Sequence, residues 1–279
     1  MSHTTNDPLL RAANDACQAE RLQEAQSLLD RWFLGTPEYA TIAGSASLKS
    51  HACQLQLESA AENGYAPLVG FLLNHNAEIN ERAVYAAHQS GSIDVFQEFL
   101  DHGWDINGRP EMTSINSAVS NNNATLVDWH LSHGANPDLH TGPGGDPLTR
   151  AAVNGMFGIV QALVEHGATL QNTEALVAAS ANTDRSQEAI KIMTYLLDAG
   201  VDINYVEKTK VKDPIYELLF AGTALHRGVE MEDAERVQLL LRRGADPNIT
   251  GRHGKTPLET AELCKLSHMV KILRAHGKT

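Results

Sequence analysis

Residues 240–248 read LLRRGADPN, and variants of this stretch recur along the chain. Six further copies are LLNHNAEIN (72–80), FLDHGWDIN (99–107), HLSHGANPD (130–138), LVEHGATLQ (163–171), LLDAGVDIN (196–204) and LRAHGKT (273–279). One aligned position holds Asn76, Gly103, Gly134, Gly167, Gly200, Gly244 and Gly277, at intervals of 27, 31, 33, 33, 44 and 33 residues. A period near 33 residues indicates a stack of repeated units.

The aligned glycine or asparagine is typical of a helix that ends in a left-handed residue, because both residues tolerate positive φ. Three residues earlier the copies carry a leucine or valine, but the last copy carries Arg274, which suits a terminal repeat. Further helix starts lie 21 residues before four of the caps: RAVYAAHQSG, DPLTRAAVNG, TALHRGVEME and TPLETAELCK. Each unit is therefore predicted to be two short antiparallel helices.

These residues resemble the ankyrin repeat. GTALH…VQLLLRRGADPN (222–248) and GKTPLETA…VKILRAHG (254–277) are similar to its consensus, and the resemblance covers nearly the whole chain in about eight units. It implies an all-α repeat fold, an ankyrin solenoid of stacked helix-turn-helix units with short β-hairpin fingers. We expect one domain over 1–279, with an irregular N-terminal capping region at 1–54 and a long finger insertion at 205–222.

The stretch Gly254-Lys255-Thr256 also matches the end of a phosphate-binding loop. That loop requires a glycine five residues before Gly254, but Ile249 stands there, and no buried strand precedes it. Thr256 is instead expected to cap a helix, with Pro257 in its first turn. Nucleotide binding is not predicted.

The spacing between cap and next helix start varies from copy to copy. The gaps Asn76–Arg82 and Gly167–Thr173 leave almost no finger, so the groove is expected to be shallower there. The segment NTDRSQE (182–188) adds residues between two helices of one unit. The segment 32–54 (WFLGTPEYATIAGSASLKSHACQ) is expected to form an extra helix or loop over the N-terminal end, with a functional lid as the alternative.

The long finger YVEKTKVKDPIYELLFAG (205–222) carries Lys208, Lys210 and Lys212 in alternation. In a strand these lysines would share one face. Such a basic edge could hold a carboxylate or phosphate ligand. Alternatively, the lysines protect an exposed edge from pairing with another strand, which is the interpretation we favour.

Composition restricts the classes of partner. The net charge of −12 argues against general binding of nucleic acid or of anionic membranes. The three cysteines form no C-x-x-C pair, so neither a disulfide framework nor a cysteine zinc site is indicated. The start lacks a secretory signal, and no run of about 18 apolar residues occurs. A soluble, cytoplasmic protein is expected, with the nucleus left open.

Thirteen histidines raise the question of catalysis or metal binding. Five directly precede the cap position and are part of the repeat pattern: His75, His102, His133, His166 and His276. The resemblance implies that His226 links neighbouring repeats through backbone hydrogen bonds. His88 and His130 break the pattern and lie in adjacent units, so they could meet as buried core histidines or in a pocket. No catalytic residue, metal site or cofactor is predicted.

The resemblance implies a non-catalytic protein-protein interaction module or scaffold that binds another protein through its concave face and fingers. The family's contact positions fall on Arg109, Glu111, Met112, Ser120, Asn121, His140, Val153, Asn154, Glu230, Met231, Arg252, His253 and Lys255. The long finger adds Tyr205, Lys208, Lys210, Lys212, Tyr216 and Phe220. The alternative is an ankyrin-fold enzyme (an isomerase, cyclase or hydrolase using acid–base chemistry) or a ligand sensor with a small-molecule pocket on the concave face.

Overall fold

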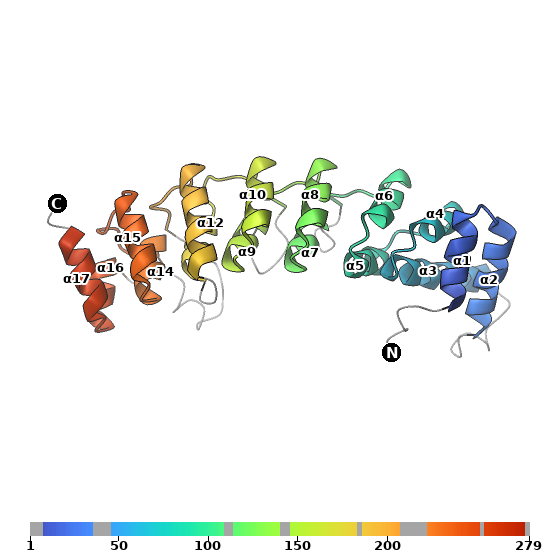
Figure 1. Cartoon of the computed structure of the whole chain (residues 1–279), viewed down its shortest axis with the longest axis horizontal. Coiled ribbons are helices and arrows are strands. Elements are labelled where there is room, and N and C mark those ends of the chain that lie inside the picture. The colour runs from blue at the N-terminus through green and yellow to red at the C-terminus, as the bar shows by residue number, and fades with distance from the viewer. Residues whose placement is uncertain are drawn as a thin grey trace. The chain divides into compact units, whose positions relative to one another are not determined.

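The computed structural model describes residues 8–35, 46–108, 114–139, 146–182, 186–206, 222–251 and 254–276. Within these residues the regular structure consists of sixteen helices and no strand (Figure 1). This confirms the predicted all-α repeat class. The contacts divide the chain into two compact units, residues 1–135 and 136–279. The extent of one domain over 1–279 stays a prediction.

Unit 1 is a stack of helix pairs. Its helices are α1 (Pro8–Gln18), α2 (Leu22–Gly35), α3 (Ala46–Glu62), α4 (Ala66–Asn74), α5 (Glu81–Ser90), α6 (Ile93–Asp101), α7 (Ser114–Ser120) and α8 (Ala124–Ser132). Within this unit α3 packs on α5 and α5 on α7, while α4 packs on α6. From α3 onward the first and second helices of successive repeats therefore form two separate layers, whereas α1 packs on α2 and α4.

Unit 2 follows the same scheme. Its helices are α9 (Pro147–Val153), α10 (Phe157–Glu165), α11 (Ala175–Ser180), α12 (Ser186–Asp198), α14 (Ala224–Glu230), α15 (Ala234–Arg242), α16 (Pro257–Leu263) and α17 (Ser267–His276). The first helices α9, α11, α14 and α16 contact one another in this order. In the second layer α10 packs on α12, and α15 packs on α17.

The predicted left-handed caps are confirmed wherever the structure describes them. Asn76 has φ of 68°, and Gly103, Gly134, Gly167, Gly200 and Gly244 have φ between 82° and 94°. The histidine before the cap adds a hydrogen bond from ring Nδ1 to the carbonyl oxygen four residues earlier. The distances are 2.7 Å for His75, 2.8 Å for His102 and His133, and 2.9 Å for His166. These histidines thus cap helices.

The helix starts also use side-chain caps. Thr256 and Glu259 form a capping box, in which the Thr256 Oγ1 accepts from the Glu259 amide at 3.2 Å and the Glu259 carboxylate accepts from the Thr256 amide at 2.8 Å. Pro257 follows in the first turn of α16. The Gly-Lys-Thr stretch therefore starts a helix, as predicted. Helix α5 starts at Glu81, capped by Asn80, whose side-chain oxygen accepts from the Ala83 amide at 2.9 Å.

Two irregular segments are partly described. Residues 32–35 end α2 and 46–54 begin α3, so these parts of the 32–54 segment extend neighbouring helices and form no separate element. Residues 36–45 lie outside the described residues. Of the 182–188 segment, Asn182 follows α11 and residues 186–188 begin α12, while residues 183–185 lie outside the described residues.

Small residues in the first helices permit close packing. Ala83, Ala87, Ala118, Ala151 and Ala179 are fully buried. The second helices add larger apolar side chains from their inner faces, among them Phe96, Phe99, Leu163, Leu196 and Leu240. The stacking surfaces are thus occupied, and contacts with other molecules must come from helix ends and connections.

Candidate functional site

The C-terminal ends of the first helices expose the same two repeat positions in four repeats, one of which holds Leu263 and Cys264 at the end of α16. In the other three repeats these positions hold six residues: Ser120 and Asn121 at the end of α7, Val153 and Asn154 at α9, and Glu230 and Met231 at α14. Val153 is 42% exposed and Met231 is 37% exposed, which is unusual for large apolar side chains in this chain. All six residues belong to the predicted contact set.

Hydrogen bonds fix these helix ends. The Ser120 hydroxyl donates to the Asn116 carbonyl oxygen at 2.8 Å, and the Asn121 amide nitrogen Nδ2 donates to the His88 carbonyl oxygen of the preceding repeat at 3.2 Å. In unit 2 the Asn154 side chain donates to the Arg150 carbonyl oxygen at 2.8 Å. The exposed positions are therefore presented on a rigid backbone.

The other predicted contact residues are less well defined. Lys255 is exposed before α16, and Tyr205 is half-buried after α12. Outside the described residues lie Arg109, Glu111, Met112, His140, Lys208, Lys210, Lys212, Tyr216, Phe220, Arg252 and His253. The described parts of the connections contain no strand, and the remaining parts of the fingers lie outside the described residues. The predicted role of these residues stays a prediction.

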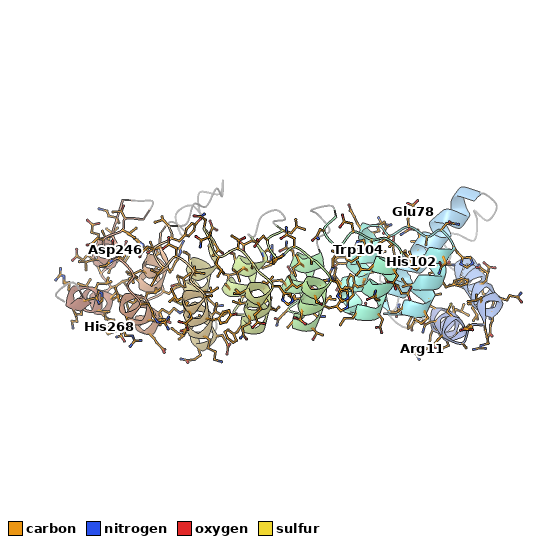
Figure 2. The ribbon with its side chains drawn as sticks, turned by 90° about the horizontal axis from the view of Figure 1, so that it is seen from above. Arg11, Glu78, His102, Trp104, Asp246 and His268 are labelled. Atoms are coloured by element: carbon orange, nitrogen blue, oxygen red, sulfur yellow. The ribbon has the colours of Figure 1, made fainter. Side chains whose placement is uncertain are left out.

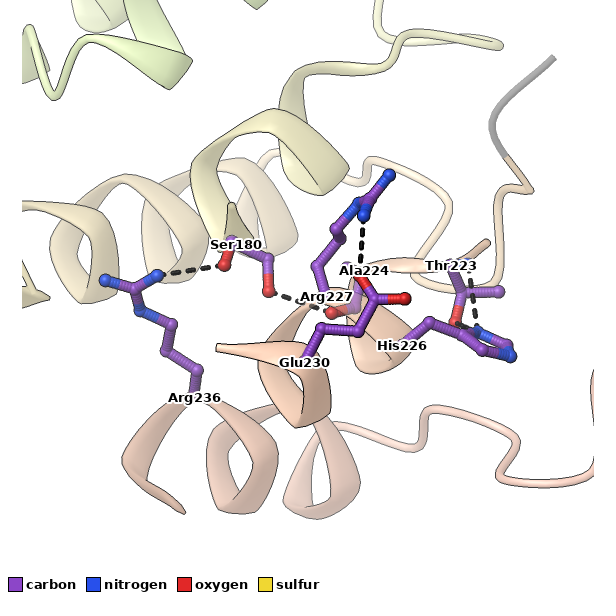
Figure 3. A network of polar contacts seen from close by, with 7 residues as sticks. All are labelled: Ser180, Thr223, Ala224, His226, Arg227, Glu230 and Arg236. Atoms are coloured by element: carbon purple, nitrogen blue, oxygen red, sulfur yellow. Dashed lines mark hydrogen bonds and ion pairs between the residues drawn. The ribbon is translucent and has the colours of Figure 1, made fainter. Parts of the chain in front are cut away.

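Two buried arginines in unit 2 belong to a polar network that was not predicted from the sequence (Figure 3). The side chains of Arg227 and Arg236 are each only 2% exposed. The Arg227 Nη1 donates to the Glu230 carboxylate at 2.5 Å. The Arg236 Nη1 donates to the Ser180 carbonyl oxygen at 2.9 Å, and its Nε lies 3.0 Å from the Asp233 carboxylate. Burial lowers the pKa of Arg236, and the Asp233 carboxylate opposes this shift.

A sequence signal for Arg236 exists. The same position holds Val95, Leu126, Ile159, Ile192 and Met269 in other repeats. Helix α11 ends at Ser180, two residues before the inserted segment 182–188. Arg236 donates a hydrogen bond to the carbonyl oxygen at this helix end, which would otherwise have no partner within the helix. This explains why a charged residue replaces an apolar one only in this repeat.

The predicted link through His226 is confirmed. Its ring Nδ1 accepts from the Thr223 amide at 3.1 Å, so Nε2 carries the proton and donates to the Lys255 carbonyl oxygen of the next repeat at 3.0 Å. Burial lowers the pKa of His226, while the bond to the Lys255 backbone raises it. His226 is therefore a structural link between repeats.

His88 and His130 meet in the core of unit 1, with ring centroids 5.6 Å apart. They are 4% and 0% exposed, and neither ring nitrogen of either residue has a hydrogen-bond partner among the described residues. Aromatic rings surround them: Phe96 lies 4.8 Å from each histidine ring, and Trp129 lies 5.3 Å from His130. Burial lowers the pKa of His88 to about 4. Burial, followed by repulsion from His88 and His133, lowers the pKa of His130 to about 3.

A hollow of about 650 Å³ lies beside the short connection between α4 and α5. Its lining includes Glu58 of α3, Glu78 of the connection, Glu81 and Arg82 of α5, and Trp104 and Asp105 after α6. A second hollow of about 410 Å³ shares Glu78, Trp104 and Asp105 and reaches His102. Figure 2 labels Glu78, His102 and Trp104, which lie near one another in unit 1. The shortened finger is visible in the sequence, but the hollow beside it was not predicted.

The described residues give no support to a metal site or a membrane span. They contain no cluster of three histidine, cysteine, aspartate or glutamate side chains arranged to bind a metal ion. None of their helices has the length and apolarity that crossing a bilayer requires.

Comparison with known proteins identifies the repeats. A model of three ankyrin repeats matches residues 115–207, and a single ankyrin repeat model matches 222–252. A fowlpox virus protein named for its ankyrin repeats is 26% identical over 197 residues, covering 61% of this chain and 27% of that protein. The nuclear factor NF-kappa-B p105 subunit of Gallus gallus is 32% identical over 172 residues, covering 59% and 16%. The human ankyrin repeat and SOCS box protein 6 is 26% identical over 215 residues, covering 69% and 47%.

The two-layer stack of helix pairs defines a helical repeat protein, and the matched repeats give its family. The chain is an ankyrin repeat protein. It spans less than half the length of each of these three relatives. The matched residues account for four repeats, and the total of about eight stays a prediction.

Proposed function

We propose that this ankyrin repeat protein is a non-catalytic recognition module that binds another protein through its concave face and finger loops. Ankyrin repeats are in general protein-interaction modules, so the coarse function follows from the family. The finer proposal is supported by the recurring exposed pair at the ends of α7, α9 and α14. Exposed apolar anchors such as Val153 and Met231, set among polar neighbours, are typical of interface centres.

The geometry gives the enzyme alternative no comparable support. A catalytic pocket combines a cavity with groups whose pKa is shifted. His88 and His130 have the most strongly lowered histidine pKa values described, but neither lines either hollow at the short connection. The two histidines are therefore assigned to the core.

Photo-crosslinking tests the proposed surface. A benzophenone amino acid is placed at position 153 or 231, and in a control at the exposed Gln238 on the second helix α15. Each variant is irradiated in a lysate of the native cell, and the products are identified by mass spectrometry. We expect the same partner to be cross-linked from 153 and 231 but not from 238. Equal cross-linking from all three positions, or none from any, would contradict the proposal.

The long finger is a second contact region under this proposal. A variant with Lys208, Lys210, Lys212, Tyr216 and Phe220 replaced by serine tests it in an affinity capture against the wild-type chain. Loss of the captured partner would support a role for the finger. Unchanged capture would remove the finger from the interface while leaving the helix-end surface in place.

A further inference from the structure

The shortened connection between α4 and α5 leaves room that a normal finger would occupy. Only residues 75–80 join the two helices. The hollow of about 650 Å³ and its neighbour of about 410 Å³ lie on this connection and share Glu78, Ile79, Trp104 and Asp105. Two adjoining hollows with a common wall suit an extended segment of another chain better than one compact small molecule.

The lining of the larger hollow is strongly acidic. Its side chains include four carboxylates, from Glu58, Glu78, Glu81 and Asp105, and one guanidinium, from Arg82, which gives a charge of −3. The Glu58 carboxylate accepts from the Asn80 side chain at 3.2 Å, and the Asp105 carboxylate accepts from the Asn107 amide at 2.9 Å. Among the described residues no ion pair neutralises these carboxylates. The hollow therefore favours a cation, like the whole chain with its net charge of −12.

Trp104 provides an aromatic wall next to these carboxylates. The equivalent position in other repeats holds Ala77, Ala135, Ala168, Val201 and Ala245, so the indole is an addition to the repeat pattern. The Trp104 ring is held by Phe96 at 5.7 Å and Phe99 at 6.1 Å, and it remains partly exposed. A fixed aromatic ring beside carboxylates attracts a guanidinium or ammonium group, through the ring quadrupole as well as through charge.

Two neighbouring side chains extend this arrangement. Tyr85 is 65% exposed and lies four residues after Glu81, on the same face of α5. Gln54 lines the larger hollow, and its side-chain nitrogen is buried without a hydrogen-bond partner among the described residues. A buried donor with no partner is costly, and the carbonyl oxygen of a bound peptide could satisfy it.

We propose that the hollow bounded by Glu78, Glu81, Trp104 and Asp105 binds an arginine or lysine side chain of an extended basic segment in a partner protein. This inference rests on the proposed function as a recognition module and adds the chemistry of the partner. Arginine fits best, because its planar group can stack on the Trp104 indole while donating hydrogen bonds to a carboxylate.

The test uses the full chain, labelled with 5-fluorotryptophan, and a fluorescein-labelled peptide of alternating glycine and arginine with three arginines. Fluorine NMR reports the site, with the signals of Trp32, Trp104 and Trp129 assigned by single replacement with phenylalanine. Fluorescence anisotropy reports the affinity. We expect the arginine peptide to shift the Trp104 signal saturably, and a peptide with glutamate in place of arginine to leave it unchanged.

Two matched variants test the carboxylates. The double variant Glu78→Gln with Glu81→Gln is expected to raise the Kd of the arginine peptide about fivefold or more at low salt. The control Asp128→Asn with Glu165→Gln loses the same charge at exposed positions that line neither hollow and is expected to change the Kd less than about twofold. Circular dichroism checks that each variant is folded.

Two outcomes would overturn the inference: a Trp104 signal that does not respond to the arginine peptide, or an equal loss of affinity in both double variants. Neither outcome affects the recognition proposal, because cross-linking from positions 153 and 231 tests that independently. Conversely, a responsive hollow without any cross-linked partner would support the cation site and contradict the proposed helix-end surface.

Discussion

At the scale of single residues, Arg236 shows how one charged side chain can be required by a local irregularity. Its guanidinium bonds the last carbonyl oxygen of α11 and pairs with Asp233. The replacement Arg236→Ala removes both contacts and leaves a cavity, so we expect a loss of about 3 kcal/mol in the free energy of unfolding. Urea denaturation measures this loss.

The replacement Arg236→Met is the matched control. It introduces the residue found at the equivalent position 269 and keeps most of the volume. Since only the Ser180 and Asp233 contacts are lost, we expect a smaller cost of about 1–2 kcal/mol. If Arg236→Ala cost no more than Arg236→Met, packing around the side chain would be less important than its hydrogen bonds.

His88 and His130 should make unit 1 sensitive to acid. Their pKa values are about 4 and about 3 in the folded chain, below the ordinary value of 6.5. The unfolded chain therefore takes up protons at a higher pH than the folded chain. The contribution of the two neutral histidines to the free energy of unfolding is complete above about pH 6.5 and decreases as the pH falls toward about 4. Between pH 6.5 and pH 5 the expected loss is about 2 kcal/mol per histidine. Urea denaturation at pH 7.5, 6 and 5 tests this.

The variant His130→Leu separates these histidines from other acid-sensitive groups. Six other copies carry leucine or phenylalanine at this position, among them Leu72, Phe99 and Leu163. The replacement should leave stability at pH 7.5 unchanged or slightly higher, because it removes two unpartnered ring nitrogens. The replacement should also make the free energy of unfolding depend less on pH. A variant as acid-sensitive as the wild-type chain would assign the effect to other groups.

At the scale of helices, the caps determine where each helix ends. Gly244 has φ of 90°, and a Cβ atom there would meet nothing within 4 Å, so replacement by alanine tests backbone strain alone. We expect Gly244→Ala to lower the free energy of unfolding by about 1 kcal/mol.

Gly158, also in unit 2, is a glycine at which alanine should stabilise the chain. It lies inside α10, and a Cβ atom would again meet nothing within 4 Å. Gly158→Ala should therefore raise stability by about 0.5–1 kcal/mol, because alanine favours the helix. Opposite signs in thermal denaturation are expected: a stabilising Gly244→Ala would contradict the strain at the cap, and a destabilising Gly158→Ala would contradict the gain in helix propensity.

At the scale of the whole chain, the period of the sequence predicted the repeated helix pairs because caps and stacking residues recur at fixed spacing. His226 could be assigned in advance because the resemblance to the ankyrin repeat implies its hydrogen bond to the next repeat. The hollow at Trp104 could not, because it depends on residues from α3, α5 and two connections that only the packed structure brings together. The hydrogen bond from Arg236 to Ser180 was missed for the same reason, since the two residues lie 56 positions apart in sequence.

The repeat architecture also predicts how far along the chain one substitution reduces local stability. In a stack held by nearest neighbours, loss of one link should loosen the adjacent repeat and leave more distant ones protected. His226→Ala removes the bond to the Lys255 carbonyl oxygen, so amide hydrogen exchange should rise about tenfold in residues 254–276 and stay unchanged in 146–165. The control His166→Ala removes only a bond within its own helix, to the Ala162 carbonyl oxygen, and should affect α10 alone. If His226→Ala accelerated exchange equally from 146 to 276, this region would unfold as one cooperative body, and stability could not be assigned repeat by repeat.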